Sequence, residues 1–212
     1  MEINVKKALS VLILSLAMNL TQPAVAMPRS HPQFQTDPAL PIADSRCQLS
    51  SSNSTFDYGN QSRWQLKETQ SMRYGLTPGK RQLMVSVVCP YTQSIYLNIR
   101  GDRTPDGNFL YGRRGRLNMR LMEVQLDGQS TQVVLSTPEG KIKGASVNDL
   151  LLQPDQTFTP AIGNQPLQGK SFSARFEIEP VLSESDTRVS DRQSSEATLT
   201  LELLPSSATS SD

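Results

Sequence analysis

The amino-acid sequence predicts an all-β fold, an antiparallel sandwich of two sheets that carries one disulfide bond. Short segments in which apolar and polar residues alternate recur along the chain, and turn residues separate them. The composition points the same way, because only 19% of the 212 residues are charged and Ser, Thr and Gln together number 58. Such a polar, weakly charged mixture is more typical of an extracellular β-protein than of a helical cytosolic enzyme.

The first 26 residues have the pattern of a secretory signal peptide. Lys6 and Lys7 precede an apolar run at residues 8–16, and the Ala-Val-Ala sequence at residues 24–26 supplies a site for signal peptidase. The apolar run is shorter than the roughly 20 residues that a membrane-spanning helix needs. We therefore expect cleavage after residue 26 and export of the mature chain; a retained signal anchor is the alternative.

Export decides how the two cysteines are interpreted. Cys47 and Cys89 are the only thiols of the chain. An oxidising compartment is expected to pair them as a disulfide, and two buried free thiols are the alternative. A zinc or redox site is not expected, and the sequence predicts no cofactor.

The clearest alternation in the first half of the chain lies at residues 83–89. Four side chains share the face that we expect to be buried: Leu83, Val85, Val87 and Cys89. Pro90 is expected to end this strand, because proline cannot donate to a β-ladder. A second strand, at residues 95–99, stops at Gly101, so residues 90–93 are predicted to form a hairpin loop.

The second half contains a change of parity and two further strands. Leu117 and Leu121 keep one parity whereas Val124 and Leu126 keep the other, which predicts a β-bulge or a strand that changes sheets. Residues 172–178 alternate as far as Pro180. The last strand is the most regular, with these apolar positions: Ala197, Leu199, Leu201 and Leu203.

Besides the signal peptide, two segments fall outside the predicted sandwich domain, which spans residues 46–204, and a third is predicted to be a connection within it. Residues 27–45 carry four prolines and are expected to be extended. Residues 183–195 are polar and predict a long surface connection. The tail at residues 205–212 is nearly all Ser, Thr and Ala and is expected to be disordered.

The search for catalytic chemistry yields exclusions, and we expect no enzymatic activity. The single histidine, His31, lies between Ser30 and Pro32 in the extended N-terminal segment, where no Ser-His-Asp triad is expected. No glycine-rich phosphate loop is present. Glu177 and Glu179 share one strand face, but we interpret them as a solvated edge rather than a glycosidase pair.

Charge is unevenly distributed along a chain whose overall charge is close to zero. Six arginines lie between Arg100 and Arg120, with Arg113, Arg114 and Arg116 closest together. They could bind a polyanion such as a sulfated glycan, although a solvated loop is the simpler interpretation. Residues 177–212 carry more acidic than basic residues. This acidic region and the arginine-rich region could meet within one sandwich or between copies of the chain. The near-neutral total argues against a nucleic-acid partner.

Several ordered features resemble the chaperone-usher fimbrial subunits, in particular the beta-fimbrial group of pilin-like proteins. The segments that carry the resemblance are Arg46-Cys47-Gln48-Leu49, Phe56-Asp57-Tyr58-Gly59, residues 83–89, Tyr96-Leu97-Asn98-Ile99, Phe109-Leu110-Tyr111-Gly112, residues 117–128 and residues 197–203. The cysteine spacing and the Asp-Tyr-Gly sequence are moderately specific. The remaining segments match the family only in pattern.

The resemblance implies an immunoglobulin-like sandwich that lacks its last strand and has an open groove. In this family a periplasmic chaperone fills the groove first, and the N-terminal extension of the next subunit replaces it at an outer-membrane usher. The donor positions in this chain would be Phe34, Thr36, Leu40 and Ile42. The groove and core strands would be those with Leu83, Val85, Val87, Ala197, Leu199, Leu201 and Leu203.

The function that the resemblance implies is that of a structural subunit of a bacterial surface fimbria that contributes to adhesion. Its partners would be the chaperone, the usher, neighbouring fimbrial subunits and a host receptor. The chain would reach the cell surface through the periplasm. The alternative is a self-sufficient secreted β-sandwich that binds a glycan or another polyanion through the surface between Arg100 and Arg120.

Overall fold

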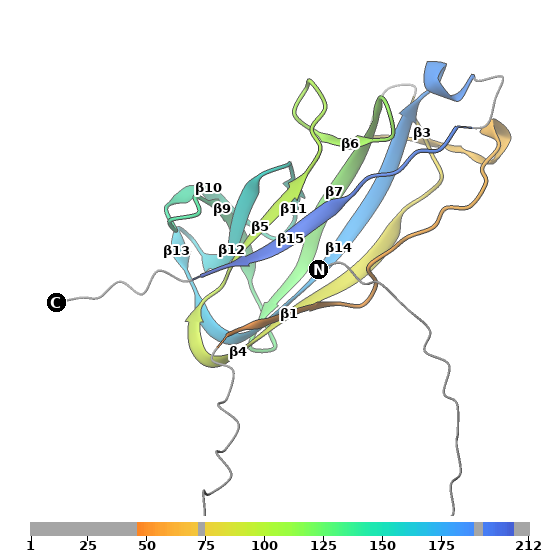
Figure 1. Cartoon of the computed structure of the whole chain (residues 1–212). Coiled ribbons are helices and arrows are strands. Elements are labelled where there is room, and N and C mark those ends of the chain that lie inside the picture. Colours follow the sequence, from red (N-terminus) through yellow and green to blue (C-terminus); the bar gives the residue numbers. More distant parts are fainter. Residues whose placement is uncertain (1–45, 72–74, 189–192, 206–212) are drawn as a thin grey trace, which may run out of the picture. The chain divides into compact units, whose positions relative to one another are not determined.

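The computed structural model describes residues 46–71, 75–188 and 193–205 (Figure 1). This part of the chain forms two antiparallel β-sheets and contains no α-helix, only two single 3-10 turns, η1 (Arg63–Gln65) and η2 (Ser185–Thr187). The predicted all-β sandwich with one disulfide is therefore confirmed. Among the described residues, no helix has the length and apolar character needed to cross a membrane.

The first sheet has nine strands, and its centre is the long strand β14. Its members are β1 (Gln48–Ser51), β2 (Lys67–Thr69), β3 (Gly75–Thr77), β4 (Arg81–Ser94), β6 (Phe109–Tyr111), β7 (Gly115–Leu126), β8 (Gln129–Ser130), β11 (Leu150–Leu152) and β14 (Gln168–Ser183). Strand β14 pairs with β7 along one side and with β4 and then β3 along the other. Strand β1 lies beyond β4, at the end of this path.

The second sheet has six strands in the order β10-β9-β12-β5-β15, with β13 beside β12. Its members are β5 (Tyr96–Gly101), β9 (Gln132–Ser136), β10 (Ile142–Val147), β12 (Gln156–Ile162), β13 (Gln165–Pro166) and β15 (Leu199–Leu204). Side chains from both sheets build one core, and its largest fully buried members are Phe109, Phe158, Phe172, Phe176, Ile95, Leu97, Ile99 and Leu121.

The predicted bulge is present in β7. Opposite β14, the register shifts between the pairs Ser173↔Gln125 and Arg175↔Met122. Glu123 takes a positive φ of 52° at this point. Leu121 and Val124 are consequently both buried although an even alternation would place them on opposite faces.

The expected end of the first long strand at Pro90 is wrong, and so is the hairpin loop at residues 90–93. Strand β4 continues through Pro90 to Ser94. Proline is tolerated here because the ladder to β14 is interrupted between the pairs at Val88 and Gln93, so no ladder bond is lost. The buried residue Ile95 then carries the chain into β5, which belongs to the other sheet.

Candidate functional site

Strands β1 and β15 each lie at the end of a sheet. Within the described residues, β1 pairs with β4 and β15 pairs with β5, and neither has a second partner. The chain passes from one sheet to the other at several points, and two of these links are from β4 to β5 and from β13 to β14. Strand β4 pairs with β14 in one sheet, and β5 pairs with β12 in the other. The two pairs lie over each other, because Ile95 alone links β4 to β5 and the ring centroids of Phe158 in β12 and Phe176 in β14 are 6.2 Å apart. The strands beyond them, β1 and β15, therefore lie along the same side of the sandwich (Figure 1).

The inward side chains of this open side are less buried than their neighbours on the inner strands. Leu199, Leu201 and Leu203 of β15 contact the core but are only partly buried. Their partners on β5 include Ile99, which is 2% exposed, and Leu97, which is fully buried. The apolar face of β15 is therefore covered on one side by β5 and open on the other.

Strand β1 shows the same asymmetry. Leu49 lies opposite Val87 in the β1–β4 ladder. Val87 is fully buried, whereas Leu49 contacts the core and stays partly buried. The two end strands thus border one apolar surface, which we call the β1–β15 edge and define by Leu49, Leu199, Leu201 and Leu203.

The groove and core positions predicted from the sequence are mostly placed along or behind this edge. Val85 and Val87 are buried in β4, and Leu83 of the same strand is partly buried. Ala197 contacts the core but precedes β15, which begins at Leu199. The predicted donor positions, which are Phe34, Thr36, Leu40 and Ile42, lie outside the described residues, as do the predicted signal peptide and residues 206–212.

The disulfide holds the outer strand of the first sheet in place. Cys47 and Cys89 are bonded, as predicted, with their Cα atoms 4.1 Å apart. Cys47 directly precedes β1, and Cys89 follows Val88, which pairs with Gln48. A four-residue end strand would have few ladder bonds of its own to keep its register, and the crosslink fixes one of its ends.

The Asp-Tyr-Gly sequence follows β1 along the chain and forms a tight turn. The Gly59 N–H donates to Asp57 Oδ1 at 2.7 Å, which closes a tight turn with a positive φ at Gly59. Tyr58 turns its ring toward the protein, where the guanidinium carbon of Arg81 lies 5.5 Å from the ring centroid. Burial raises the pKa of Tyr58 to about 12, and the nearby charge of Arg81 opposes this shift.

The two carboxylates predicted to form a solvated edge have separate partners. Glu179 is only 7% exposed, and it accepts hydrogen bonds from the hydroxyls of Thr69 and Ser71, both at 2.8 Å. Glu177 pairs with Lys80 at 2.7 Å, and the pKa of its carboxyl is lowered chiefly by this hydrogen bond. The interpretation of Glu179 as a solvated residue is wrong, because the β2–β3 hairpin covers it.

Four of the six arginines between Arg100 and Arg120 pair with carboxylates. The pairs are Arg100 with Glu202 at 3.1 Å, Arg103 with Asp155 at 3.2 Å, Arg114 with Asp186 at 3.9 Å, and Arg116 with Asp106. The sequence leaves open whether the basic and acidic regions meet within one sandwich or between copies. The pairs of Arg100 with Glu202 and of Arg114 with Asp186 show that they meet within one sandwich at these two points. Most of the local positive charge is compensated within the chain.

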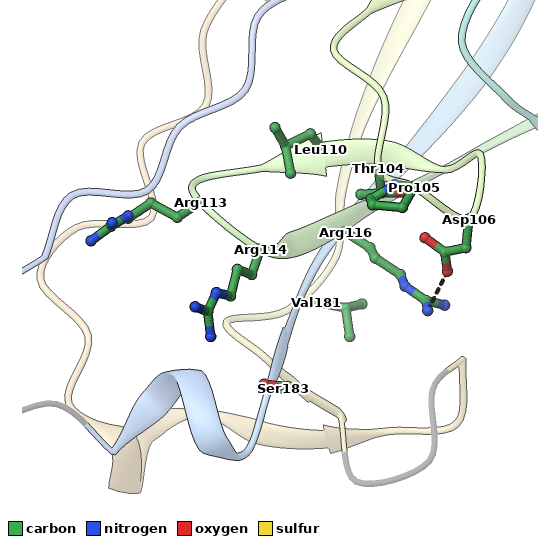
Figure 2. Close-up of a pocket in the computed structure, with 9 residues that line it drawn as sticks. All are labelled: Thr104, Pro105, Asp106, Leu110, Arg113, Arg114, Arg116, Val181 and Ser183. Atoms are coloured by element: carbon green, nitrogen blue, oxygen red, sulfur yellow. Dashed lines mark ion pairs between the residues drawn. The ribbon is translucent and has the colours of Figure 1, made fainter.

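The three clustered arginines line a pocket of about 360 Å³ between the β6–β7 turn and the end of β14 (Figure 2). Figure 2 shows that their side chains diverge: Arg116 reaches Asp106, while Arg113 and Arg114 point in other directions. Arg114 is 81% exposed and holds Asp186 only at 3.9 Å. The three do not form a single converging site.

One functional candidate was not singled out from the sequence. Trp64, in η1, is 89% exposed, the highest value among the large apolar residues of the described chain. Its only sequence signal is that it is the single tryptophan. No group of three or more His, Cys, Asp or Glu side chains that could hold a metal ion occurs among the described residues.

Comparison with known proteins adds no family to these observations. No protein-family model matches the chain, and no curated protein matches it either.

Proposed function

We propose that the chain is a structural subunit of a bacterial surface fimbria, assembled by chaperone-usher donor-strand exchange and contributing to adhesion. The observation that carries this proposal is the β1–β15 edge, where inward leucines of two end strands stay partly buried along one side of the sandwich. An end strand with free backbone groups and an apolar inner face accepts an added strand from another chain by β-augmentation.

An added strand must meet two requirements at the β1–β15 edge. Its backbone would complete the ladder of β15 or β1, and its alternate side chains would cover Leu199, Leu201 and Leu203. In the predicted donor, Phe34, Leu40 and Ile42 recur on one parity, as this surface requires. A periplasmic chaperone would supply the strand first, and the next subunit would replace it at the outer-membrane usher.

The competing function is a self-sufficient secreted sandwich that binds polyanions through the whole surface between Arg100 and Arg120. The internal ion pairs argue against this broad surface, because Arg100, Arg103 and Arg116 each face a carboxylate of the same chain. Ion pairs of this kind leave few guanidinium groups available for a ligand.

The proposal is tested on the surface-sheared fraction of cells that express the chain. Half of the sample is loaded unheated on a denaturing gel and half is boiled, and both are probed with antibody against the chain. We expect a ladder that collapses to the subunit mass on boiling, because strand-exchanged contacts resist detergent until heated. A lone monomer band in both samples of a strongly expressing strain would overturn the fimbrial proposal.

A further inference from the structure

Three surface segments meet at one end of the sandwich. Arg63 of η1 donates to Glu184 at 2.5 Å, next to η2, and Arg114 of the β6–β7 turn pairs with Asp186 within η2. Figure 1 shows the two helical turns, one orange and one blue, at this same end. The pocket lined by Arg113, Arg114 and Ser183 adjoins them, since Ser183 directly precedes Glu184.

Trp64 is displayed on a fixed support at this end. The Ser62 N–H donates to the Gln65 side-chain oxygen at 2.7 Å, and the Gln65 N–H donates to the Ser62 carbonyl at 2.9 Å. These bonds close the turn that carries Trp64, and the Arg63–Glu184 pair ties the turn to the neighbouring segment. A large aromatic ring held in solvent by a closed turn has the character of a contact surface rather than of a core residue.

The guanidinium carbon of Arg63 lies 6.0 Å from the centroid of the Trp64 ring, and the other arginines at this end differ in whether they already have a partner. Arg63 and Arg188 both bind the Glu184 carboxylate, and Arg116 binds Asp106. Arg114 is largely exposed with only a loose contact, and Arg113 is exposed with no ion pair to the described residues. Two guanidinium groups are therefore available to an external anion at the end of the sandwich that also carries the exposed tryptophan.

We infer that this end of the sandwich, which carries Trp64, Arg113 and Arg114, is a binding site for an anionic oligosaccharide. The flat tryptophan face matches the apolar face of a sugar ring, and guanidinium groups bind carboxylate or sulfate through paired charged hydrogen bonds. The pocket floor adds Leu110 and Val181. This site lies apart from the β1–β15 edge and goes beyond the proposed fimbrial function.

An oligosaccharide fits these observations better than a nucleic acid or a membrane surface does. Nucleic-acid affinity comes from many phosphate contacts, and a membrane surface needs several unpaired cations with an apolar face. Here two arginines are available in the described part of this end, the chain is close to neutral overall, and one aromatic ring is exposed at the same end. A small ligand with one or two acidic groups is the size that these residues can hold.

The test uses the intrinsic fluorescence of the exported chain, because Trp64 is its only tryptophan and reports on this site alone. The titrants are a heparin-derived oligosaccharide, an oligogalacturonate and a neutral maltooligosaccharide of matched length. We expect a saturable fluorescence change with a sulfated or carboxylated probe and none with the neutral one. Replacing both arginines (R113Q/R114Q) should weaken binding at least about tenfold, because two charged hydrogen-bonding groups are lost.

Matched variants make the outcome decisive. R120Q removes the same charge from an exposed position on β7, away from the pocket, and should leave binding unchanged. W64A should abolish binding in calorimetry while its thermal unfolding stays close to that of the parent, and W64F should keep most of the affinity. Absence of binding to every anionic probe, an equal loss in R120Q, or equal quenching by a DNA oligonucleotide would overturn the inference. None of these readouts depends on whether a fimbrial ladder forms.

Discussion

Leu201 lies directly opposite Ile99 in the β15–β5 ladder, yet Ile99 is 2% exposed and Leu201 is only partly buried. Opposite residues in an antiparallel pair point to the same face of the sheet, so both side chains face the core. The difference arises because Ile99 has strands on both sides and Leu201 has one only on the β5 side, within the described residues. A strand added beside β15 would remove this difference.

A charge at Leu201 should therefore affect assembly more than folding. L201E places a carboxylate where an added strand would insert its side chains, and we expect loss of the heat-sensitive ladder. The free energy of unfolding of the subunit should fall by only about 1 kcal/mol, because the position is already partly solvated. Urea unfolding and the unheated gel measure the two effects.

The matched control at this edge is T200E, because Thr200 is the exposed neighbour that points to the opposite face of β15. This variant should assemble like the parent. A ladder of normal length in L201E would contradict the role of this edge.

The disulfide offers a second prediction, on stability. Replacing Cys47 and Cys89 by serine opens a loop with a sequence separation of 42, which the chain-entropy description values at about 4 kcal/mol. We expect the double variant to lose up to this amount in urea unfolding, and end strand β1 to become the first segment to exchange its amide hydrogens. Equal stability and equal exchange in the oxidised parent and the variant would show that β1 does not depend on the crosslink.

The parts of the fold that the sequence predicts are those governed by side-chain periodicity. The alternation at residues 83–89 identifies the buried face of β4, and the parity change after Leu121 identifies the bulge at Glu123. The prediction that Pro90 ends the strand is wrong because the effect of a proline depends on the ladder of a partner strand far along the chain. Whether two consecutive strands form a hairpin or enter different sheets also depends on such distant partners.

The candidate sites also contain some features that side-chain periodicity predicts and others that it does not. The inward leucines of β15 follow from period two, whereas their incomplete burial follows from the absence of a neighbour on one side, which no local pattern records. Trp64 and the arginines of the β6–β7 turn lie on irregular segments, where periodicity gives no direction to a side chain. Glu179 is buried because the β2–β3 hairpin, which is distant in the sequence, covers it.

Gly112 offers a test of how the start of β15 is positioned. It has a φ of 62°, and its N–H donates to the Glu196 carbonyl at 2.9 Å. A Cβ at this position would lie 2.7 Å from the Ser195 hydroxyl and 3.2 Å from the Ser195 Cα. Gly112→Ala therefore combines the cost of a positive φ with a clash, and we expect a loss of about 1–3 kcal/mol in urea unfolding.

Gly163→Ala measures the stability cost of a positive φ without the clash. Gly163 has a similar φ of 59°, but nothing lies within 4 Å of an added Cβ. The stability difference between the two variants measures the contact between the β6–β7 turn and the segment before β15. Equal losses in both variants would show that this contact has no influence on stability.

Asp127 predicts a specific dependence of stability on pH. Its Oδ1 accepts hydrogen bonds from the Ser171 N–H at 2.7 Å and the Lys170 N–H at 2.9 Å, and these bonds lower the pKa of the carboxyl. The stabilisation by the ionised form is present above the pKa of the unfolded state and is lost as pH falls through the lower pKa of the folded state. The parent should be more stable than D127N at neutral pH, and the difference should shrink in acid.

The measurement for Asp127 is the urea midpoint of both proteins between about pH 7 and about pH 2.5. D149N serves as the control, since Asp149 is an exposed aspartate in the loop before β11. A constant difference between the parent and D127N across this range would exclude the proposed linkage.

Tyr58 predicts a loss of stability as the pH rises in the alkaline range, whereas Asp127 predicts a loss in acid. Burial raises its pKa to about 12, from the usual 10.0, so the folded state favours the neutral phenol. Stability from this group is complete below the pKa of the unfolded state and decreases as pH rises through the pKa of the folded state. Its hydroxyl is also buried without a hydrogen-bond partner among the described residues. Tyr58→Phe should therefore leave stability at pH 7 unchanged or raise it by up to about 1 kcal/mol, because no hydrogen bond is lost.

Ultraviolet titration of the phenols separates this prediction from a general effect of removing a tyrosine. The parent should show a phenol that ionises near pH 12, and Y58F should lack that step. Burial also raises the pKa of Tyr111, so Y111F is the matched variant and should keep the step near pH 12 that belongs to Tyr58. If Y58F is destabilised by more than 1 kcal/mol at neutral pH, the hydroxyl has a partner that this part of the chain does not provide. A step near pH 12 that keeps its full amplitude in Y58F would assign the pKa of about 12 to another phenol.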